Sequence, residues 1–304
     1  MNLMDELEGQ AITIIREVVL AARRPVVLFS GGKDSAVLVR LVQMAFFPEP
    51  APVTLLHIDT GHNFPETMTF IREVVEESRL PLIRAEVQEW IDRGRLTEVR
   101  RTGRLVSRNR LQSRVLVDVI TEQGFDVALG GARRDEDRAR AKEHLVSVRK
   151  ADGSWDPLEQ SPEPWGQVCI AAPPGGHARA FPLSDWTEID VWNYIVNAGV
   201  RVPDLYFMHR RALVQREGRM FAVTDAVPAR TGETPTTQWC RFRTVGDVTC
   251  TTAVMPRPGR PVSFPASPIE VLEDLYAVND SERAGRADDD GDAAMEDRKV
   301  AGYF

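Results

Sequence analysis

One short segment, Ser30-Gly-Gly-Lys-Asp-Ser35, gathers the residues of this chain that are best suited to chemistry. An apolar run typical of a buried strand, Val26–Phe29, leads into it, and a helical pattern begins directly after it. The two adjacent glycines let the backbone turn tightly and approach a ligand closely. A helix N-terminus offers unpaired N–H groups and a positive dipole end, and Lys33 adds a charged donor. This combination predicts a cradle for an anion such as a phosphate group.

The spacing of this loop differs from that of the Walker A motif, which needs four residues between its glycines. It resembles instead the pyrophosphate loop (PP-loop) of the adenine nucleotide alpha-hydrolase-like ATPases. The resemblance implies cleavage of ATP between its α and β phosphates. The alternative is an ordinary strand–turn–helix junction capped by serines, but the complete string favours a phosphate site. We therefore expect nucleotide contacts from Phe29, Ser30, Gly31, Gly32, Lys33, Asp34 and Ser35.

A second apolar run, which begins near Val53, ends on two polar side chains, His57 and Asp59. They lie two residues apart, so a strand would place them on one face. Asp59 could bind a ribose hydroxyl or help to hold magnesium near the phosphates. His57 could equally be a hydrogen-bonded histidine of the core. We expect both residues at the nucleotide site.

A third strand end carries Gly130 and Gly131, followed closely by Arg133, Arg134 and Asp135. Glycines again allow a close approach of the backbone, and the planar forks of arginine suit sulfate or phosphate oxygens. The alternative is an exposed helix with charge pairs four residues apart, but of two such pairs Arg138–Lys142 is repulsive and Ala139–Glu143 holds no charge pair. We expect the glycines to contact nucleotide and predict catalytic roles for the two arginines and Asp135, together with Lys33.

These polar ends follow strands that alternate with helices along the chain. We predict strands at about 25–29, 53–58, 81–86 and 126–130, and helices at 8–23, 35–46, 64–78 and 109–123. This alternation predicts the α/β class, with a Rossmann-like parallel sheet. In such sheets ligands bind beyond the carboxyl ends of the strands, where all three polar ends would meet.

The later part of the chain is less regular. Residues 151–180 are rich in Pro, Gly and Trp and predict an ordered loop, after which Thr187 and Asp190 have the spacing of a helix capping box. Beyond about 226 we predict Pro- and Gly-rich loops, a short helix at 268–279 and an acidic tail. We therefore expect a catalytic PP-loop domain at 1–225 and an irregular extension at 226–304 that docks a partner.

Composition excludes several classes of function. The 304 residues carry a net charge of −7, which disfavours binding of bulk nucleic acid. No apolar run is long enough to span a membrane, and the start of the chain lacks the apolar core of a signal peptide. The three cysteines form no C-x-x-C pair. We expect a cytoplasmic protein without a membrane or nucleic-acid partner.

The positive charges are nevertheless concentrated in two central segments. Eight arginines and one acid lie between 93 and 114, and seven cations among four acids lie between 133 and 150. The second segment contains the glycine–arginine motif described above, which favours a site for a small anion. For the first segment a solvated basic face and an anion site both stay open.

Longer motifs resemble subunit 2 of bacterial sulfate adenylyltransferase over nearly the full length. They are Gly130-Gly-Ala-Arg-Arg-Asp-Glu136, Arg140-Ala-Lys-Glu143, Trp155-Asp-Pro157, Phe181-Pro-Leu-Ser184, Arg241-Phe-Arg-Thr244, Ser281-Glu-Arg283 and Gly302-Tyr-Phe304. The resemblance implies that ATP and sulfate react to give adenylyl sulfate and pyrophosphate. It also implies a heterodimer with a GTPase large subunit, whose own Walker A motif this chain lacks.

The resemblance also implies ligands for the substrates. Candidate sulfate ligands are Arg133, Arg134, Arg140, Lys142, Arg241 and Arg243. ATP would be a substrate, and Mg²⁺ would bind near the phosphates, with Asp34 as its protein ligand. The chain departs from the family pattern at Gly31, at 111–113 and at 246–253, so a divergent paralogue in a specialised sulfur pathway stays an alternative.

Two other PP-loop enzymes are further alternatives. A phosphoadenylyl-sulfate reductase would need a nucleophilic cysteine near the C-terminus, but the last cysteine here is Cys250. A tRNA-modifying enzyme would use the arginines of 93–114 as an RNA face, yet no aromatic side chain for base stacking accompanies them.

Overall fold

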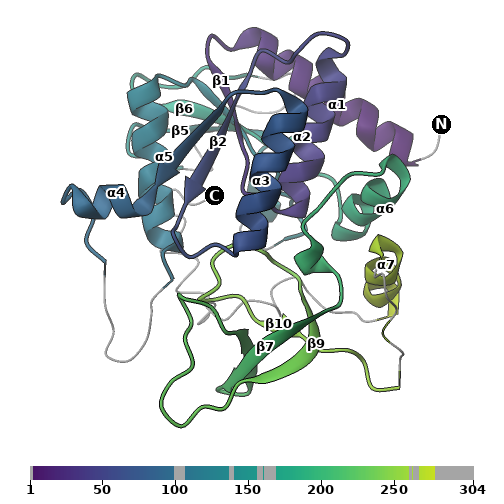
Figure 1. Ribbon diagram of the computed structural model, residues 1–304. Helices are drawn as coiled ribbons and strands as arrows, with labels where there is room; N and C mark the ends of the chain where they lie inside the picture. Colours follow the sequence, from purple (N-terminus) through teal and green to yellow (C-terminus); the bar gives the residue numbers. More distant parts are fainter. Residues whose placement is uncertain are drawn as a thin grey trace.

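The computed structural model describes residues 3–98, 107–136, 140–155, 160, 169–259, 262 and 267–277. A six-stranded sheet in the order β3-β2-β1-β4-β6-β5 forms its centre (Figure 1). Five strands run parallel and β5 pairs antiparallel at one edge. The strands are β1 (Pro25–Leu28), β2 (Thr54–Asp59), β3 (Leu82–Glu86), β4 (Val127–Leu129), β5 (Val146–Arg149) and β6 (His177–Ala180). The predicted Rossmann-like parallel sheet is confirmed.

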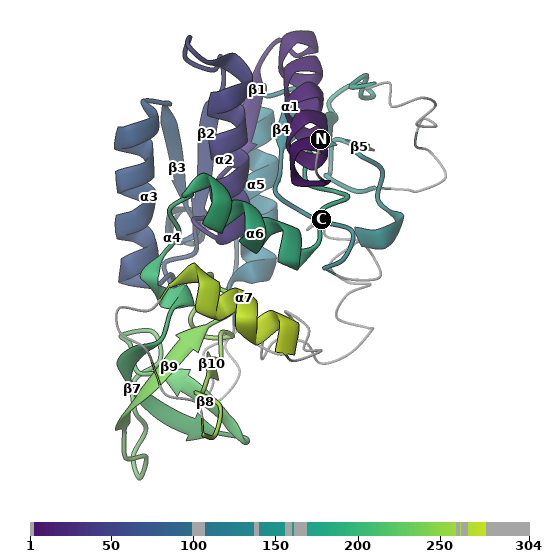
Figure 2. The same cartoon turned by 90° about the vertical axis from the view of Figure 1, so that its right-hand side faces the viewer.

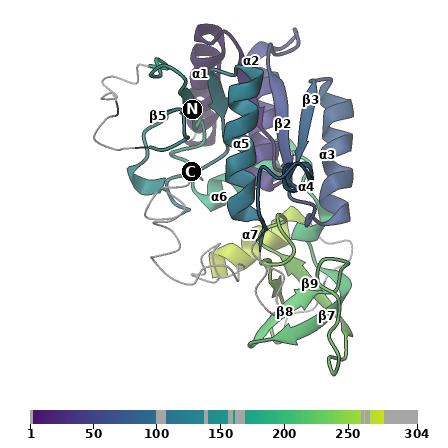
Figure 3. The ribbon, with the colours of Figure 1, turned by 90° about the vertical axis from the view of Figure 1, so that its left-hand side faces the viewer.

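Helices cover both faces of this sheet. One face carries α1 (Leu3–Ala21), α2 (Lys33–Phe46), α3 (Pro65–Ser78) and α6 (Glu188–Ala198), and the other carries α4 (Val87–Asp92) and α5 (Asn109–Gln123). Figure 2 shows the first group in front of the sheet, and Figure 3 shows α5 on the opposite side. Each face has its own apolar core, as expected for a parallel sheet buried on both sides.

The predicted elements up to residue 130 are confirmed, with small shifts at their ends. The helix predicted at 109–123 has the bounds of α5, and α2 begins two residues earlier than predicted, at Lys33. The predicted capping box is also present, because Thr187 and Asp190 each accept a backbone N–H of the other.

The prediction of an ordered loop at 151–180 was wrong at its end. Residues 177–180 form β6 in the sheet, and β5 precedes the loop. Both strands carry buried polar side chains, Arg149, His177 and Arg179 among them, instead of an apolar run. The hydrophobic pattern therefore gave no strand signal here.

The region after α6 contains a second sheet that was not predicted, and two of its strands lie beyond 226, where loops and a short helix were predicted. Its strands are β7 (His209–Arg216), β8 (Arg219–Ala222), β9 (Thr236–Phe242) and β10 (Ala253–Val254), in the antiparallel order β10-β9-β7-β8. A short turn, η4 (Asp204–Tyr206), precedes this sheet, and α7 (Pro268–Ala277) follows it. Figure 1 places the second sheet below the carboxyl ends of β1 and β2.

The predicted boundary at 225 falls between β8 and β9. It would separate strands that pair in one sheet, because β7 pairs with both β8 and β9. The division into 1–225 and 226–304 stays a prediction, and a boundary near 207 would keep the sheet whole. In the described part of the chain, no helix is long and apolar enough to cross a membrane.

Candidate active site

The phosphate loop lies where β1 passes into α2. Gly31 has a φ of +79°, and a Cβ placed there would lie 2.9 Å from side-chain carbons of Thr67 and Ile71. Only glycine fits this conformation and this space. A Cβ on Gly131, after β4, would lie 3.0–3.1 Å from backbone atoms of Asp34 and Ser35. The glycine segment after β4 thus packs against the first turn of α2.

The two serines of the loop stabilise its conformation through hydrogen bonds within the loop. Their hydroxyl oxygens lie 3.1 Å apart, Ser30 Oγ accepts the N–H of Gly32 at 3.3 Å, and the Ser35 hydroxyl donates to the Gly32 carbonyl at 2.9 Å. The N-cap residue of α2 is Gly32, which has no side chain to cap the first turn. The serines therefore fix the shape of the loop at a helix N-terminus, the kind of site that binds anions.

Lys33 is almost completely buried at this loop, with 1% of its surface exposed. Its Nζ lies 3.0 Å from Asp34 Oδ2 and 4.0 Å from Glu188 Oε1. Its backbone N–H donates to the hydroxyl of Tyr206 at 3.0 Å. Glu188 and Tyr206 come from α6 and η4, so two distant elements close over the loop.

Arg133 is the second buried cation of the site. Its Nε donates to Asp135 Oδ1 at 2.9 Å, and its Nη1 contacts Asp34 Oδ1 and lies 3.8 Å from Glu136 Oε1. Asp135 also accepts the N–H of Glu188 at 2.8 Å, which joins this cluster to α6. Three carboxylates therefore hold one guanidinium between the loop and the end of β4.

The structure places the remaining candidates of the 133–150 segment farther from the loop. Arg134 is one-third exposed, and its guanidinium contacts Asp185. Arg140 lies 2.8 Å from Glu136 Oε2, in the short turn Arg140–Lys142. The side chain of Lys142 lies outside the described part.

His57 and Asp59 have structural partners. The Nδ1 of His57 lies 2.9 Å from the Phe29 carbonyl, and burial lowers the pKa of this histidine, so its ring stays neutral near pH 7. Asp59 accepts from Arg84 Nη2 at 2.5 Å and from the Gly61 N–H at 2.7 Å. Both residues fix the end of β2, and their predicted contacts with the nucleotide stay predictions.

The last two candidates lie at the end of β9. Arg243 donates to Glu188 Oε2 at 2.7 Å, and Glu188 lies in turn beside Lys33. Arg241 is paired with Asp274 of α7 at 3.6 Å. The second sheet thus connects to the phosphate loop through Arg243 and Glu188, whereas Arg241 faces α7.

The predicted magnesium ligand does not fit its role in this arrangement. Both carboxylate oxygens of Asp34 are engaged, one by Lys33 and the other by Arg133. Among the described residues, no group of three or more His, Cys, Asp or Glu could hold a metal ion. We derive no chemical step through a metal bound to Asp34.

Two residues of the site were missed by the reasoning from the sequence, Glu188 and Tyr206. Tyr206 lies 173 positions along the chain from the loop residue that it contacts, and no periodic pattern marks it. Glu188 follows the predicted cap residue Thr187, which explains its position on α6 but not its contact with Arg243. Neither residue had a local signal that points to the loop.

Most of the described arginines in the segment 93–114 are paired with acids. Arg93, Arg95, Arg108 and Arg114 each contact an acid of α4, α5 or the intervening loop. Arg108 also donates to the Thr60 carbonyl at 2.9 Å, which ties this segment to the end of β2. Residues 99–106 lie outside the described part.

Comparison with known proteins gives consistent results. Residues 24–253 match the family described as "Phosphoadenosine phosphosulfate reductase domain". Over 98% of this chain and 93% of the relative, the sequence is 45% identical to "Sulfate adenylyltransferase subunit 2" of Mycolicibacterium vanbaalenii. A protein of the same name from Streptomyces lavendulae is 44% identical over 99% of this chain and 92% of its own length. Among solved structures, the FMN adenylyltransferase of Candida glabrata covers 93% of this chain and 87% of its own, with a TM-score of 0.48 and 13% identity.

Proposed function

Because this chain belongs to the family of sulfate adenylyltransferase subunit 2, we propose that it transfers the adenylyl group of ATP to sulfate, with adenylyl sulfate and pyrophosphate as products. The observation that carries the proposal is the 45% identity over 98% of the chain. The buried phosphate loop, closed by Glu188 and Tyr206, supplies the chemistry that such a transfer needs.

The transfer is an in-line displacement at the α-phosphorus. An oxygen of sulfate forms a bond to the phosphorus, and the bond from phosphorus to the oxygen that bridges the α and β phosphates breaks. The electron pair of the broken bond leaves with pyrophosphate. Sulfate is already an anion near neutral pH, so no general base is needed and catalysis consists of positioning and electrostatic stabilisation.

We assign the residues of the loop the predicted roles in this step. The loop amides and Lys33 would bind the β- and γ-phosphates, and the lysine would neutralise charge on the departing pyrophosphate. Arg133 and Asp135 would hold the end of β4 against the α-phosphate side of the loop. Mg²⁺ would be held by the phosphates of the nucleotide, since Asp34 is engaged by two cations.

The partner of this chain would be the large subunit of the same enzyme, a GTPase. The name "subunit 2" of the relatives supports a partner subunit. Formation of a mixed anhydride from ATP and sulfate is uphill, so coupling to GTP hydrolysis would raise its yield. We expect docking through residues 226–304, of which 278–304 lie outside the described part.

The two cysteines nearest the C-terminus favour this function over sulfonucleotide reduction, which would need a nucleophilic cysteine near that end. Cys240 and Cys250 are buried, and burial raises the pKa of the Cys240 thiol to about 11, so this thiol carries little thiolate near neutral pH.

The test is an assay of the chain with its large subunit in the presence of ATP and GTP. We expect pyrophosphate release and adenylyl sulfate formation that depend on sulfate. Release of pyrophosphate without sulfate, or none with it while ATP still binds, would contradict the proposed acceptor.

A further inference from the structure

Two buried arginines of the second sheet, Arg241 and Arg243, are held very differently. They lie two residues apart at the end of β9, and each faces a carboxylate from a different helix. Arg243 donates to Glu188 of α6 at 2.7 Å, which is a normal charged hydrogen bond. Arg241 lies 3.6 Å from Asp274 of α7, which is too long for one.

The guanidinium of Arg241 is poorly satisfied. It has five N–H donors and is only 6% exposed, yet it donates no hydrogen bond to any residue that the structure describes. Asp274 is shared, because Arg257 Nε lies 3.5 Å from its other carboxylate oxygen. Burial lowers the pKa of Arg241. A buried charged group without hydrogen bonds is costly, so this arginine favours an acceptor that enters from outside.

The other candidate sulfate ligands with described side chains are already engaged. Arg133 is surrounded by three carboxylates, Arg140 pairs with Glu136 at 2.8 Å, and Arg134 contacts Asp185. A sulfate ion would have to break a short contact at each of these arginines. At Arg241 it would replace only one long, shared ion pair.

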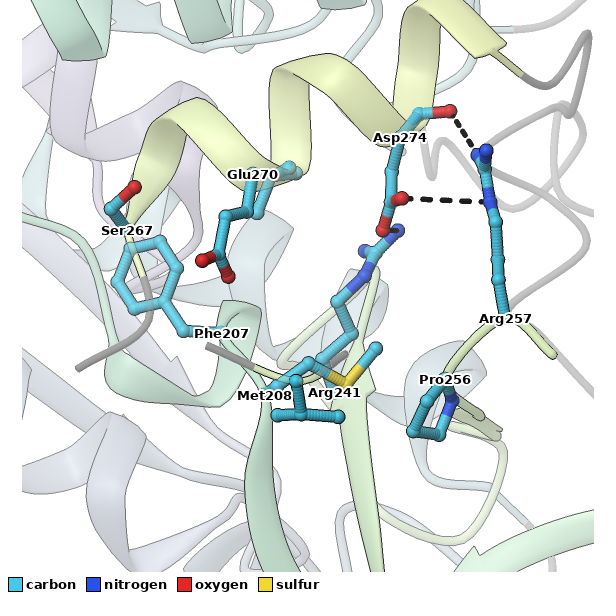
Figure 4. Close-up of a pocket in the computed structure, with 10 residues that line it drawn as sticks. Phe207, Met208, Arg241, Pro256, Arg257, Ser267, Glu270 and Asp274 are labelled. Atoms are coloured by element: carbon cyan, nitrogen blue, oxygen red, sulfur yellow. Dashed lines mark hydrogen bonds and ion pairs between the residues drawn. The ribbon is translucent and has the colours of Figure 1, made fainter. Parts of the chain in front are cut away.

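Arg241 also lines a pocket between β9 and α7 (Figure 4). The pocket is further lined by Phe207, Met208, Pro256, Arg257, Glu270 and Asp274. Its two arginines face two carboxylates, so the pocket is neutral at rest, and a dianion would have to take the place of Asp274. Figure 4 shows Asp274 between the two guanidinium groups, where an exchange of anions would occur.

The pocket adjoins the phosphate loop through two sets of contacts. Phe207 follows Tyr206 directly, and the Tyr206 hydroxyl accepts the N–H of Lys33. Arg241 also lies within electrostatic range of Glu188, which is 4.0 Å from the Lys33 amine. An anion at Arg241 would therefore lie on the side of the loop from which η4 and α6 approach it.

We propose that Arg241 binds the sulfate that accepts the adenylyl group, and that Asp274 is a resting counter-ion which the sulfate displaces. This inference rests on the proposed function, since it names the acceptor site of that reaction. A tetrahedral dianion offers several oxygens to the unsatisfied donors of Arg241, and the displaced carboxylate keeps its contact with Arg257.

Two variants test the proposal in opposite directions. Arg241→Gln should raise the KM for sulfate at least tenfold and change the KM for ATP less than twofold. Asp274→Asn should lower the KM for sulfate about threefold, because it removes the competing carboxylate. Glu273→Gln makes the same charge change on the neighbouring residue of α7, which does not line the pocket, and should leave both constants within twofold. Each variant is measured as the full chain with its large subunit.

A structural role for the pair would give a different result. If Asp274→Asn raises the KM for sulfate as Arg241→Gln does, or if both raise the KM for ATP equally, the proposal is overturned. Arg241→Lys keeps a positive charge, so it covers the case in which Arg241→Gln does not fold, and it should raise the sulfate KM by a smaller factor.

Equilibrium dialysis with radiolabelled sulfate separates this inference from the proposed function. It is carried out on the full chain with a non-hydrolysable ATP analogue present. Sulfate binding that Arg241→Gln or Arg241→Lys weakens would support the site even if no adenylyl sulfate forms. Catalysis with sulfate binding that neither variant changes would overturn the site and leave the reaction in place. If the wild-type chain retains no sulfate, the site is overturned.

Discussion

The phosphate loop and the end of β9 both present buried cations, but they neutralise them in opposite ways. At the loop, Lys33 and Arg133 are each held within 3.0 Å of a carboxylate, and Asp34 joins the two. At β9, Arg241 depends on a single ion pair of 3.6 Å that Asp274 shares with another arginine. The first region is rigidly satisfied, whereas the second is left short of acceptors.

This difference indicates different tasks. A group that stabilises charge in a transition state acts best when neighbours hold it in place before the reaction. A group that takes up and releases a small anion needs donors that are free to exchange partners. The loop cluster fits the first task and Arg241 fits the second.

A buried aspartate joins the region of the second sheet to the larger sheet and its helices. Asp247, in the segment after β9, accepts the backbone N–H of Arg108 at 2.9 Å and that of Thr249 at 2.8 Å. The N–H of Val248 donates to the His62 carbonyl at 2.8 Å. These contacts fasten the end of the second sheet to the loop after β2 and the start of α5.

The largest expected effect concerns the loop lysine. Lys33→Ala should lower the rate of pyrophosphate release at least a hundredfold, because loss of a preorganised charge typically costs on the order of 3 kcal/mol in the barrier. The measurement is the initial rate of pyrophosphate release under saturating substrates. Lys150→Ala, at an exposed turn, is the matched control. Retention of more than a third of the wild-type rate would remove Lys33 from the phosphate site.

The second prediction tests whether the loop region is rigidly satisfied. Arg133→Gln should destabilise the protein by about 3 kcal/mol, since it removes the buried cation that three carboxylates share. Arg134→Gln should cost less than about 1 kcal/mol, because this arginine is one-third exposed and its partner Asp185 is mostly exposed. Urea unfolding of both variants checks this, and equal losses would contradict the contrast.

The third prediction tests the contact between the segment after β9 and the start of α5. Asp247→Asn should cost about 2 kcal/mol at pH 7, because an amide nitrogen would face donors that now bond to a carboxylate. Burial by itself would raise the pKa of Asp247, but the interaction with His62 and the hydrogen bonds from Thr249 outweigh it and lower the pKa. The exposed Asp225→Asn is the control.

The lowered pKa fixes the pH dependence of this contact. The stabilisation by Asp247 is fully present above the unfolded pKa of about 3.9, and it is lost as the pH falls through the folded value. Urea unfolding at pH 7 and at pH 3 should therefore show a smaller difference between wild type and Asp247→Asn in acid. A difference that grows in acid would show that the charge of Asp247 is not the stabilising feature.

The smallest effect is expected at His57, which is buried under the loop as a neutral histidine. Its pKa is lowered by burial, so the wild type should lose stability as the pH falls below about 6.5, by at most about 1.4 kcal/mol per pH unit. His57→Gln should remove that part of the slope and lower the rate of pyrophosphate release less than threefold. Urea unfolding between pH 7.5 and 5.5 measures the slope, with His144→Gln as control. A tenfold loss of activity would instead place His57 in direct contact with substrate.

The sequence by itself determined the position of the phosphate loop and the sheet that carries it. Apolar strands, amphipathic helices and the Gly-Gly-Lys-Asp string are local patterns, so the carboxyl ends of β1, β2 and β4 could be predicted to meet. Local spacing also gave the capping box at Thr187. The strands β5 to β10 were not predicted. They are short or polar, so their sequences lack the hydrophobic periodicity that identifies a strand.

Only the tertiary structure decided which of the arginines has close acceptors and which has few. All six candidate cations looked alike in sequence, because charge and spacing do not show how many acceptors surround a side chain. That number depends on Glu188, Tyr206 and Asp274, which approach from separate elements far along the chain. The number of acceptors around a buried cation depends on how distant segments pack together, so it can be determined only from the folded structure.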